Sequence, residues 1–360
     1  MKNLKELIAI NSSVNKDEIV CYLQKKFQEF AEEILVISNK ENQDKSIVVG
    51  LNTKLKDIKP IVLSGHIDTV SPDLNLYNTN PFELVIQGDR AYGVGSVDMK
   101  SFAAVIMDNC EALKKMNYPL VVVFTTDEET DLICIENVIE KFKELNILPR
   151  FTIVGEPTNS EIQNRANGCF EYQVEVLGKS CHASIIDQGV NAINIMARII
   201  TFIEDEQKEF ASLTSNCGVV DGGDVVNRVP GICKLKFDIR GENSVEIDEF
   251  LNKIKLKINQ IEDCYPGSKI ILKNTLKIPP LQEENNQLIN ALANKFNLSI
   301  SKFSGGCEAG YYQALSGSAI LFGVGDMALA HKPNEYVNIV EYKKYSNTLI
   351  SLISAMIKAF

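Results

Sequence analysis

The sequence predicts an α/β protein in which a larger domain is interrupted by a smaller inserted one. In the first part, apolar strand segments alternate with amphipathic helical segments, a pattern typical of a sheet with helices on both faces. Near residue 167 the order becomes β-α-β-β-α-β, and the first pattern resumes after Pro279 and Pro280. We therefore expect residues 1–166 and 279–360 to form one domain and residues 167–278 to form the insert.

Composition argues against several classes of function. The chain of 360 residues has a formal net charge of -10, whereas nucleic-acid binding proteins carry basic patches. No stretch reaches the apolar length of a membrane span. The nine cysteines include no C-x-x-C pair, and the N-terminal residues lack the apolar core of a signal peptide. We expect reduced thiols, a cytoplasmic location, and neither nucleic acid nor membrane as a partner.

The larger domain is expected to begin with helices. The N-terminal residues read as a short helix, and Asn15 with Glu18 has the spacing of a capping box. Apolar residues at intervals of three and four then predict a helix from Asn15 to Ile34. Short apolar runs follow at Leu35–Ile37 and Ser46–Leu51, strands are expected at Ile61–Leu63, Leu120–Thr126 and Phe151–Val154, and helices at Met99–Leu113 and Ile135–Leu145.

The insert begins with Phe170–Leu177, which alternates apolar and polar residues as a half-buried strand does. Its other expected elements are helices at Gly189–Phe210 and Val245–Ile261 and strands at Asn216–Val220, Cys233–Ile239 and Lys269–Leu272, the order of a ferredoxin-like unit. For the last part of the chain we expect a helix at Asn286–Phe296, a strand at Ala319–Phe322 and a closing helix containing Leu349, Leu352, Ile353 and Met356.

The stretch S-G-H-I-D follows the apolar strand segment Ile61–Leu63. His66 and Asp68 stand at i and i+2, so an extended backbone places both side chains on one face. A carboxylate beside an imidazole can fix its tautomer and leave the other nitrogen free for a metal ion. By itself, the stretch is more simply a strand that ends in a polar turn, with His66 a hydrogen-bonded structural histidine.

The chain has only three histidines, His66, His182 and His331. Four carboxylates stand near expected strand ends or turns: Asp98, Glu128, Glu129 and Glu156. Imidazoles and carboxylates without cysteine suit one or two Zn²⁺ or similar ions. The adjacent pair of glutamates fits a metal ligand next to a base for water. Each acid taken singly is more simply a solvated turn residue, so the metal interpretation depends on the set.

Six motifs of the chain, taken in order, resemble those of the M20 metallopeptidase/deacylase family. They are S-G-H-I-D-T-V, Y-G-V-G-S-V-D-M-K, T-T-D-E-E-T, G-E-P-T, G-K-S-C-H-A-S and H-K-P-N-E-Y, and they span residues 60 to 340. The resemblance implies a two-zinc hydrolase, with Co²⁺ as another usable ion. It also implies a split catalytic domain with a mixed sheet and flanking helices, an inserted ferredoxin-like dimerisation domain, and therefore a homodimer.

The resemblance also implies roles for individual residues. His66 and Glu156 hold one zinc, Glu129 and His331 hold the other, and Asp98 bridges both. Asp68 orients His66, and Glu128 is the general base. His182, which lies in the insert, stabilises the oxyanion in the partner subunit's site. From its sequence context alone, His182 is an ordinary loop histidine.

Further stretches resemble the acetylornithine deacetylases within this family: G-V-N-A-I, G-G-D-V-V-N-R-V-P, D-I-R and C-E-A-G-Y-Y. They imply an N-acyl amino acid as the small-molecule substrate, N²-acetyl-L-ornithine first among them. Asn227 and Arg240 match positions that bind the substrate's α-carboxylate, although Arg240 also fits an ion pair at a strand end.

Departures from the family pattern lie near the substrate pockets. Asp131–Cys134 stand where small residues are usual, Asn167 where a lysine or arginine is common, and Ser101 where glycine is frequent. We therefore keep a succinyl-diaminopimelate desuccinylase, another N-acyl-amino-acid deacylase and a dipeptidase as alternatives. Outside enzymes, the alternative is a catalytically silent dimer that binds amino-acid-like ligands.

Overall fold

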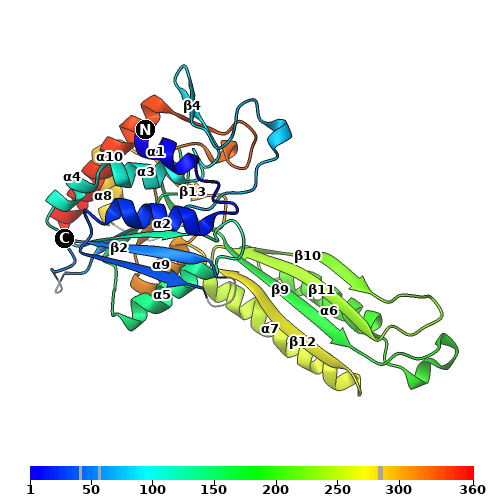
Figure 1. Cartoon of the computed structure of the whole chain (residues 1–360). Helices are drawn as coiled ribbons and strands as arrows, with labels where there is room; N and C mark the ends of the chain where they lie inside the picture. The colour runs from blue at the N-terminus through cyan, green and yellow to red at the C-terminus, as the bar shows by residue number, and fades with distance from the viewer. Residues whose placement is uncertain (40–42, 56–57, 283–286) are drawn as a thin grey trace. The chain divides into compact units, whose positions relative to one another are not determined.

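The computed structural model describes residues 1–39, 43–55, 58–282 and 287–360 (Figure 1). The chain forms two compact units, the first comprising Met1–Ala166 with Glu283–Phe360 and the second comprising Asn167–Gln282. The expected α/β class is confirmed. That the second unit folds alone and dimerises stays a prediction. Among the described residues, no helix combines the length and the apolar character needed to cross a bilayer.

The first unit is built on an eight-stranded mixed sheet. In sheet order its strands are β1 (Glu33–Ser38), β2 (Lys45–Leu51), β6 (Leu120–Thr125), β3 (Ile61–His66), β7 (Phe151–Val154), β14 (Ala319–Leu321), β8 (Ile162–Ala166) and β13 (Ile300–Phe303). The neighbours β6, β3 and β7 run parallel and are buried along their whole length. Strands buried on both faces need cover on both faces, which explains their continuous apolar sequences.

Helices supply this cover, and most of them share one apolar core with the sheet. They are α1 (Lys2–Ile8), α2 (Lys16–Phe27), α3 (Lys100–Asp108), α4 (Cys110–Lys115), α5 (Ile133–Glu144), α8 (Gln287–Phe296), α9 (Ala309–Ser316) and α10 (Ile339–Ala359). The single helix expected at Met99–Leu113 is interrupted at Asn109, whose side-chain amide donates to the Val105 carbonyl at 2.8 Å. Asn286, the expected start of α8, lies outside the described residues.

The helix expected from Asn15 to Ile34 is too long as predicted. It ends at Phe27, whose carbonyl accepts from the N–H groups of Phe30 and Ala31 in a tight turn. Ile34 lies instead on β1, opposite Val49 of β2. The β-branched and apolar residues after Glu33 pair with a sheet, and this tertiary pairing outweighs the helical spacing.

A separate three-stranded sheet was not expected. It consists of β15 (Tyr336–Asn338), β5 (Arg90–Tyr92) and β4 (Val85–Gln87), each of three residues. Tyr336 lies opposite Tyr92, so the sheet joins the segment before α3 to the segment before α10.

The second unit has the expected ferredoxin-like order of elements. These are β9 (Gly168–Leu177), α6 (Ala192–Gln207), β10 (Leu213–Gly222), β11 (Ile232–Gly241), α7 (Ser244–Cys264) and β12 (Lys269–Ile278). The sheet order is β10-β11-β9-β12, and all pairs are antiparallel. The apolar residues of α6 and α7 form a core of their own with this sheet. β10 is an edge strand and exposes Val219 and Val220, at 57% and 60%.

Candidate metal centre

The carboxyl ends of neighbouring parallel strands in the first unit carry the candidate residues. His66 is the last residue of β3, Glu128 follows β6, and Glu156 follows β7. Because β6, β3 and β7 run in the same direction, these side chains emerge at one edge of the sheet. Asp98 comes from the turn before α3, and His331 comes from the loop before β15.

Asp98 lies between two imidazoles from distant parts of the chain. Its Oδ1 is 2.9 Å from His66 Nε2, and its Oδ2 is 3.3 Å from His331 Nε2. Burial raises the pKa of the Asp98 carboxyl, but the hydrogen bonds to His331 and His66 outweigh it and leave that pKa below its ordinary value. The carboxylate thus presents one oxygen to each histidine.

The other ring nitrogen of His66 faces Asp68. The Nδ1 atom is 3.2 Å from the Asp68 carbonyl oxygen and 3.5 Å from its Oδ1. Burial lowers the pKa of His66, whereas Asp68 and Asp98 raise it, and the net pKa lies well above the ordinary value. With Nδ1–H donated to Asp68, Nε2 is the atom available to a metal ion.

Two groups of donor atoms overlap at Asp98. One group is His66, Asp98 and Glu156; the other is Asp98, Glu129 and His331; within each group the atoms lie within 4.8 Å of one another. In the second group, Glu129 Oε1 is 2.9 Å from His331 Nε2. Imidazole nitrogens and carboxylate oxygens suit Zn²⁺ and similar divalent ions. The arrangement fits two ions that share one carboxylate.

The Glu156 carboxylate gives the clearest structural support for a cation. Its side chain is 3% exposed, and its Oε1 accepts no hydrogen bond from any residue that the structure describes. Burial, opposed by His66 and assisted by Asp98, raises the pKa of Glu156 to about 8. A buried polar atom without a partner is costly, and a bound cation would remove that cost.

Glu128 belongs to neither of the two groups that share Asp98. Its side chain is 15% exposed, and its Oε2 lies 3.9 Å from His66 Nε2. Burial raises the pKa of Glu128 well above its ordinary value, with His66 opposing and Glu156 adding to the rise. A third group of His66, Glu128 and Glu129 also lies within 4.8 Å. Glu128 therefore has the reach of a ligand as well as that of a base.

The first acid of the triplet, Asp127, has a structural role. Its Oδ2 accepts from the main-chain N–H groups of Ile133 and Cys134 at 2.9 and 2.8 Å, which satisfies the first turn of α5. Leu132 before them has a positive φ of 50°. In the segment that departs from the family pattern, a bulky residue therefore adopts a conformation that glycine adopts without strain.

A buried carboxylate that sequence reasoning did not single out contacts the strands β3 and β6. Glu308 accepts from Ser64 Oγ at 3.0 Å and from Thr125 Oγ1 at 2.5 Å. Ser64 is on β3 and Thr125 ends β6, so Glu308 joins the two strands that carry His66 and the acidic turn. Its signal in the sequence is the segment C-E-A-G-Y-Y, which distinguishes subfamilies.

His182, Asn227 and Arg240 belong to the second unit. Within that unit, His182 and Asn227 lie close together, and Arg240 lies apart from them. The Ala183 N–H donates to the Asn227 carbonyl at 3.0 Å, so His182 and Asn227 lie in facing loops. Asn227 precedes β11, whereas Arg240 lies near the far end of that strand, so the strand from Ile232 to Arg240, about 26 Å of extended chain, lies between them. Arg240 is 44% exposed and donates from Nε to Asp238 at 2.9 Å, the ion pair expected as its alternative role.

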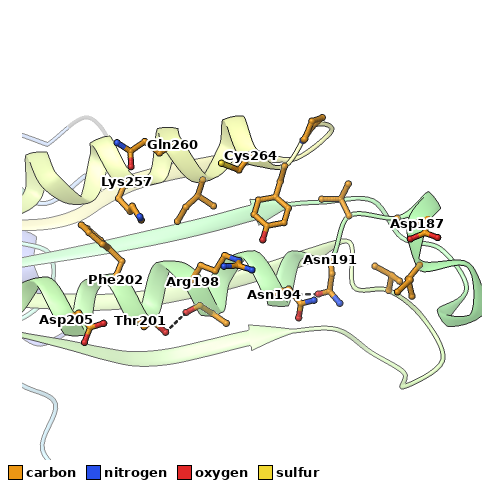
Figure 2. A pocket seen from close by; sticks show the side chains of 18 residues that line it. Asp187, Asn191, Asn194, Arg198, Thr201, Phe202, Asp205, Lys257, Gln260 and Cys264 are labelled. Carbon is orange, nitrogen blue, oxygen red and sulfur yellow. Dashed lines mark hydrogen bonds between the residues drawn. The ribbon is translucent and has the colours of Figure 1, made fainter.

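The second unit also has an open groove of about 1380 Å³ between α6 and α7. Figure 2 shows Lys257 of α7 and Phe202 of α6 on facing sides of this groove. Lys257 Nζ lies 5.4 Å from the centre of the Phe202 ring, and the Arg198 guanidinium lies 5.7 Å from that of Tyr265. Each cation lies over the face of an aromatic ring. None of the candidate catalytic or ligand residues lines this groove.

Comparison with protein families gives a match to the model of peptidase family M20/M25/M40 over residues 62–355. Among curated proteins, an acetylornithine deacetylase of Buchnera aphidicola is 31% identical over 309 residues, covering 82% of this chain and 80% of its own length. An acetylornithine deacetylase of Aliivibrio fischeri is 31% identical over 294 residues, covering 77% of this chain and 76% of its own.

Solved structures share the fold at low sequence identity. The aminopeptidase PepT of Bacillus cereus has a TM-score of 0.73 and 18% identity, covering 98% of this chain and 97% of its own. A dinuclear metal-binding M20 peptidase of Bacillus subtilis has a TM-score of 0.66 and 14% identity, covering 99% of this chain and 98% of its own.

Proposed function

Because the chain belongs to peptidase family M20/M25/M40, we propose that it is a two-zinc amidohydrolase that converts N²-acetyl-L-ornithine to L-ornithine and acetate. The observation that carries the metal chemistry is the pair of donor groups sharing Asp98. The substrate is supported by two relatives named acetylornithine deacetylase, each 31% identical to this chain. Such a reaction belongs to arginine biosynthesis.

Each candidate residue of the first unit has a separate role in metal binding or catalysis. His66 and Glu156 would hold one ion, Glu129 and His331 the other, and Asp98 both. When bound, the ions supply polarisation of the amide carbonyl and a lower pKa for the attacking water.

Glu128 is not needed to complete either of these two groups and is the candidate base. It takes a proton from the attacking water on a carboxylate oxygen and returns that proton to the departing amine. The raised pKa of its carboxyl is favourable for holding the proton between these two steps.

Residues of the second unit would complete the site in a homodimer. Arg240 offers a guanidinium to the substrate's α-carboxylate, and the partner subunit supplies His182 to the oxyanion and Asn227 to the carboxylate. The position of Asn227 before β11 and of Arg240 near the far end of that strand favours this division between subunits. The exposed valines on the edge strand β10 support a self-association surface there.

One experiment tests this function. Purified protein is assayed with N²-acetyl-L-ornithine, N-succinyl-diaminopimelate, other N-acetyl amino acids and dipeptides, and its bound metals are quantified. We expect acetate release from acetylornithine at the highest kcat/KM and about two ions per subunit. A higher kcat/KM for another substrate would reassign the specificity, and zinc-loaded protein inactive on every substrate would favour the ligand-binding alternative.

A further inference from the structure

Glu335 is a buried acid that has no role in the chemistry proposed above. It lies between the loop that carries His331 and the strand β15, and its side chain is 3% exposed. A buried carboxylate needs partners that compensate its lost hydration. Those partners are main-chain groups of the segment 93–98, which ends at Asp98.

Three N–H groups of this segment converge on the Glu335 carboxylate. Val97 and Asp98 donate to Oε1 at 2.6 and 3.0 Å, and Gly95 donates to Oε2 at 2.9 Å. In addition, the Gly93 N–H donates to the Glu335 carbonyl at 3.0 Å. Successive main-chain N–H groups directed at one anion form a concave site that fixes the chain around it.

The main chain of residues 93–98 curves around the Glu335 carboxylate. Gly95 has a φ of +77°, and a Cβ at this position would lie 2.9 Å from the Lys100 side chain and 2.9 Å from Thr69. Only glycine combines this backbone conformation with so close an approach. Lys100 is fully buried, and Glu335 and Asp68 both favour its protonated form.

We infer that Glu335 is a positioning residue of the metal centre: its carboxylate sets the main chain at Asp98 and thereby the side chain that both ions share. The inference rests on the metal centre proposed above. The Asp98 carboxylate must keep one oxygen toward His66 and the other toward His331. The Asp98 N–H held by Glu335 belongs to the same residue, so any shift of that main chain moves both oxygens together.

Loss of a residue that positions Asp98 should weaken the binding of both ions. A residue that acts only through the His331 loop would affect the group of Asp98, Glu129 and His331 alone. A residue that acts through Asp98 would weaken both groups at once. Partners behind metal ligands are commonly worth 10–100-fold in metal affinity, which sets the expected size of the effect.

The test is a metal titration of Glu335→Gln with Zn²⁺ and with Co²⁺, whose absorption reports coordination. The amide keeps the shape of the side chain but places an NH₂ group opposite N–H donors. We expect about 10–100-fold weaker binding of both ions, and partial recovery of activity when the metal concentration is raised. Glu341→Gln is the matched control, because Glu341 is an exposed acid on α10, and it should bind both ions as the wild type does.

Several outcomes would overturn the inference. Glu335→Gln with wild-type affinity for both ions would do so, and so would weakening confined to one ion. A lower melting temperature of the metal-free protein with unchanged metal affinity would make Glu335 purely structural. Glu335→Asp, which keeps the charge on a shorter side chain, serves if the amide variant does not fold; failure of both to fold would assign Glu335 to folding. A wild type that binds no ions would instead refute the proposed metal centre.

Discussion

Asp68 connects His66 to the acidic turn through its two carboxylate oxygens. Its Oδ1 lies 3.5 Å from His66 Nδ1, while its Oδ2 accepts from the main-chain N–H of Glu129 at 3.1 Å. The side chain therefore contacts both a ring that would hold one ion and the backbone of a residue that would hold the other. The orientation of His66 accounts for only one of these two contacts of the Asp68 side chain.

Asp68→Asn tests this double contact. The amide can satisfy one of its two neighbours as an acceptor but not both, so we expect about 10–100-fold loss in metal affinity or activity. Zinc content and kcat, measured over a series of free zinc concentrations, check it. Asp73→Asn, at an exposed residue that caps a short turn, is the control and should leave both quantities unchanged. Wild-type behaviour of Asp68→Asn would limit Asp68 to local structure.

Glu128→Gln should separate the base from the ligands. The amide cannot accept the proton of water, so kcat should fall by roughly 10²–10⁴, while two ions stay bound. Metal analysis and steady-state kinetics on the same preparation provide the measurement. Loss of an ion together with the activity would show that Glu128 is a ligand, as its proximity to His66 and Glu129 permits.

Arg240→Ala tests recognition of the α-carboxylate. We expect kcat/KM for acetylornithine to fall far more than kcat/KM for the same compound amidated at that carboxylate, because only the former presents the anion. Lys236→Ala, which removes an exposed cation from the same strand, should discriminate little between the two substrates. Equal losses on both substrates for Arg240→Ala would leave it with only its ion pair to Asp238.

Mixed dimers test whether His182 acts across subunits. Glu128→Ala and His182→Ala subunits, each inactive alone, are co-expressed with different tags and purified as a mixed dimer. The site on the His182→Ala subunit keeps Glu128 and receives an intact His182 from its partner, so about one site in two should work. Zinc-loaded, well-folded mixed dimers without activity would place His182 in its own subunit's site.

Lys100 predicts a pH dependence of stability. Burial, opposed by Glu335 and Asp68, lowers the pKa of Lys100 from 10.5 to about 7. Between these values the unfolded chain binds more protons than the folded one, so the Lys100 contribution to the free energy of unfolding rises with pH. Urea unfolding of chelator-treated protein from pH 7 to 10 measures the slope. Lys100→Met should reduce it by up to about 1.4 kcal/mol per pH unit, whereas Lys114→Met, at an exposed site, should preserve it. An unchanged slope in Lys100→Met would contradict this assignment.

The fold was predictable where local pattern and tertiary environment agree. β3, β6 and β7 are continuous apolar runs because they are buried on both faces, and the alternation in β9 reflects a sheet with two different faces. The strands that were missed lack such patterns. β4, β5 and β15 have three residues each, and β8 reads I-Q-N-R-A, with only its apolar residues and one asparagine buried.

The site was predictable from motif residues at strand ends, and the structure gathers five of them into two donor groups that share Asp98. Glu308 and Glu335 were missed because a buried acid and an exposed acid look alike in a sequence. Their roles depend on donors brought from elsewhere in the chain: hydroxyl groups of Ser64 and Thr125 for Glu308, and main-chain N–H groups of residues 95–98 for Glu335.

The place of β14 in the sheet determines when this protein can assemble during synthesis. It lies between β7 and β8, although both leave the ribosome long before residues 319–321 are made. Until then the nascent chain holds two strands whose facing edges are unpaired, and such edges favour association with other chains. His331 and Glu335 emerge later still, so a ribosome-bound chain has a helix-covered partial sheet but no complete pair of donor groups. The group of Asp98, Glu129 and His331 is therefore completed late, and a chain interrupted before residue 331 would carry Asp98 without its second histidine.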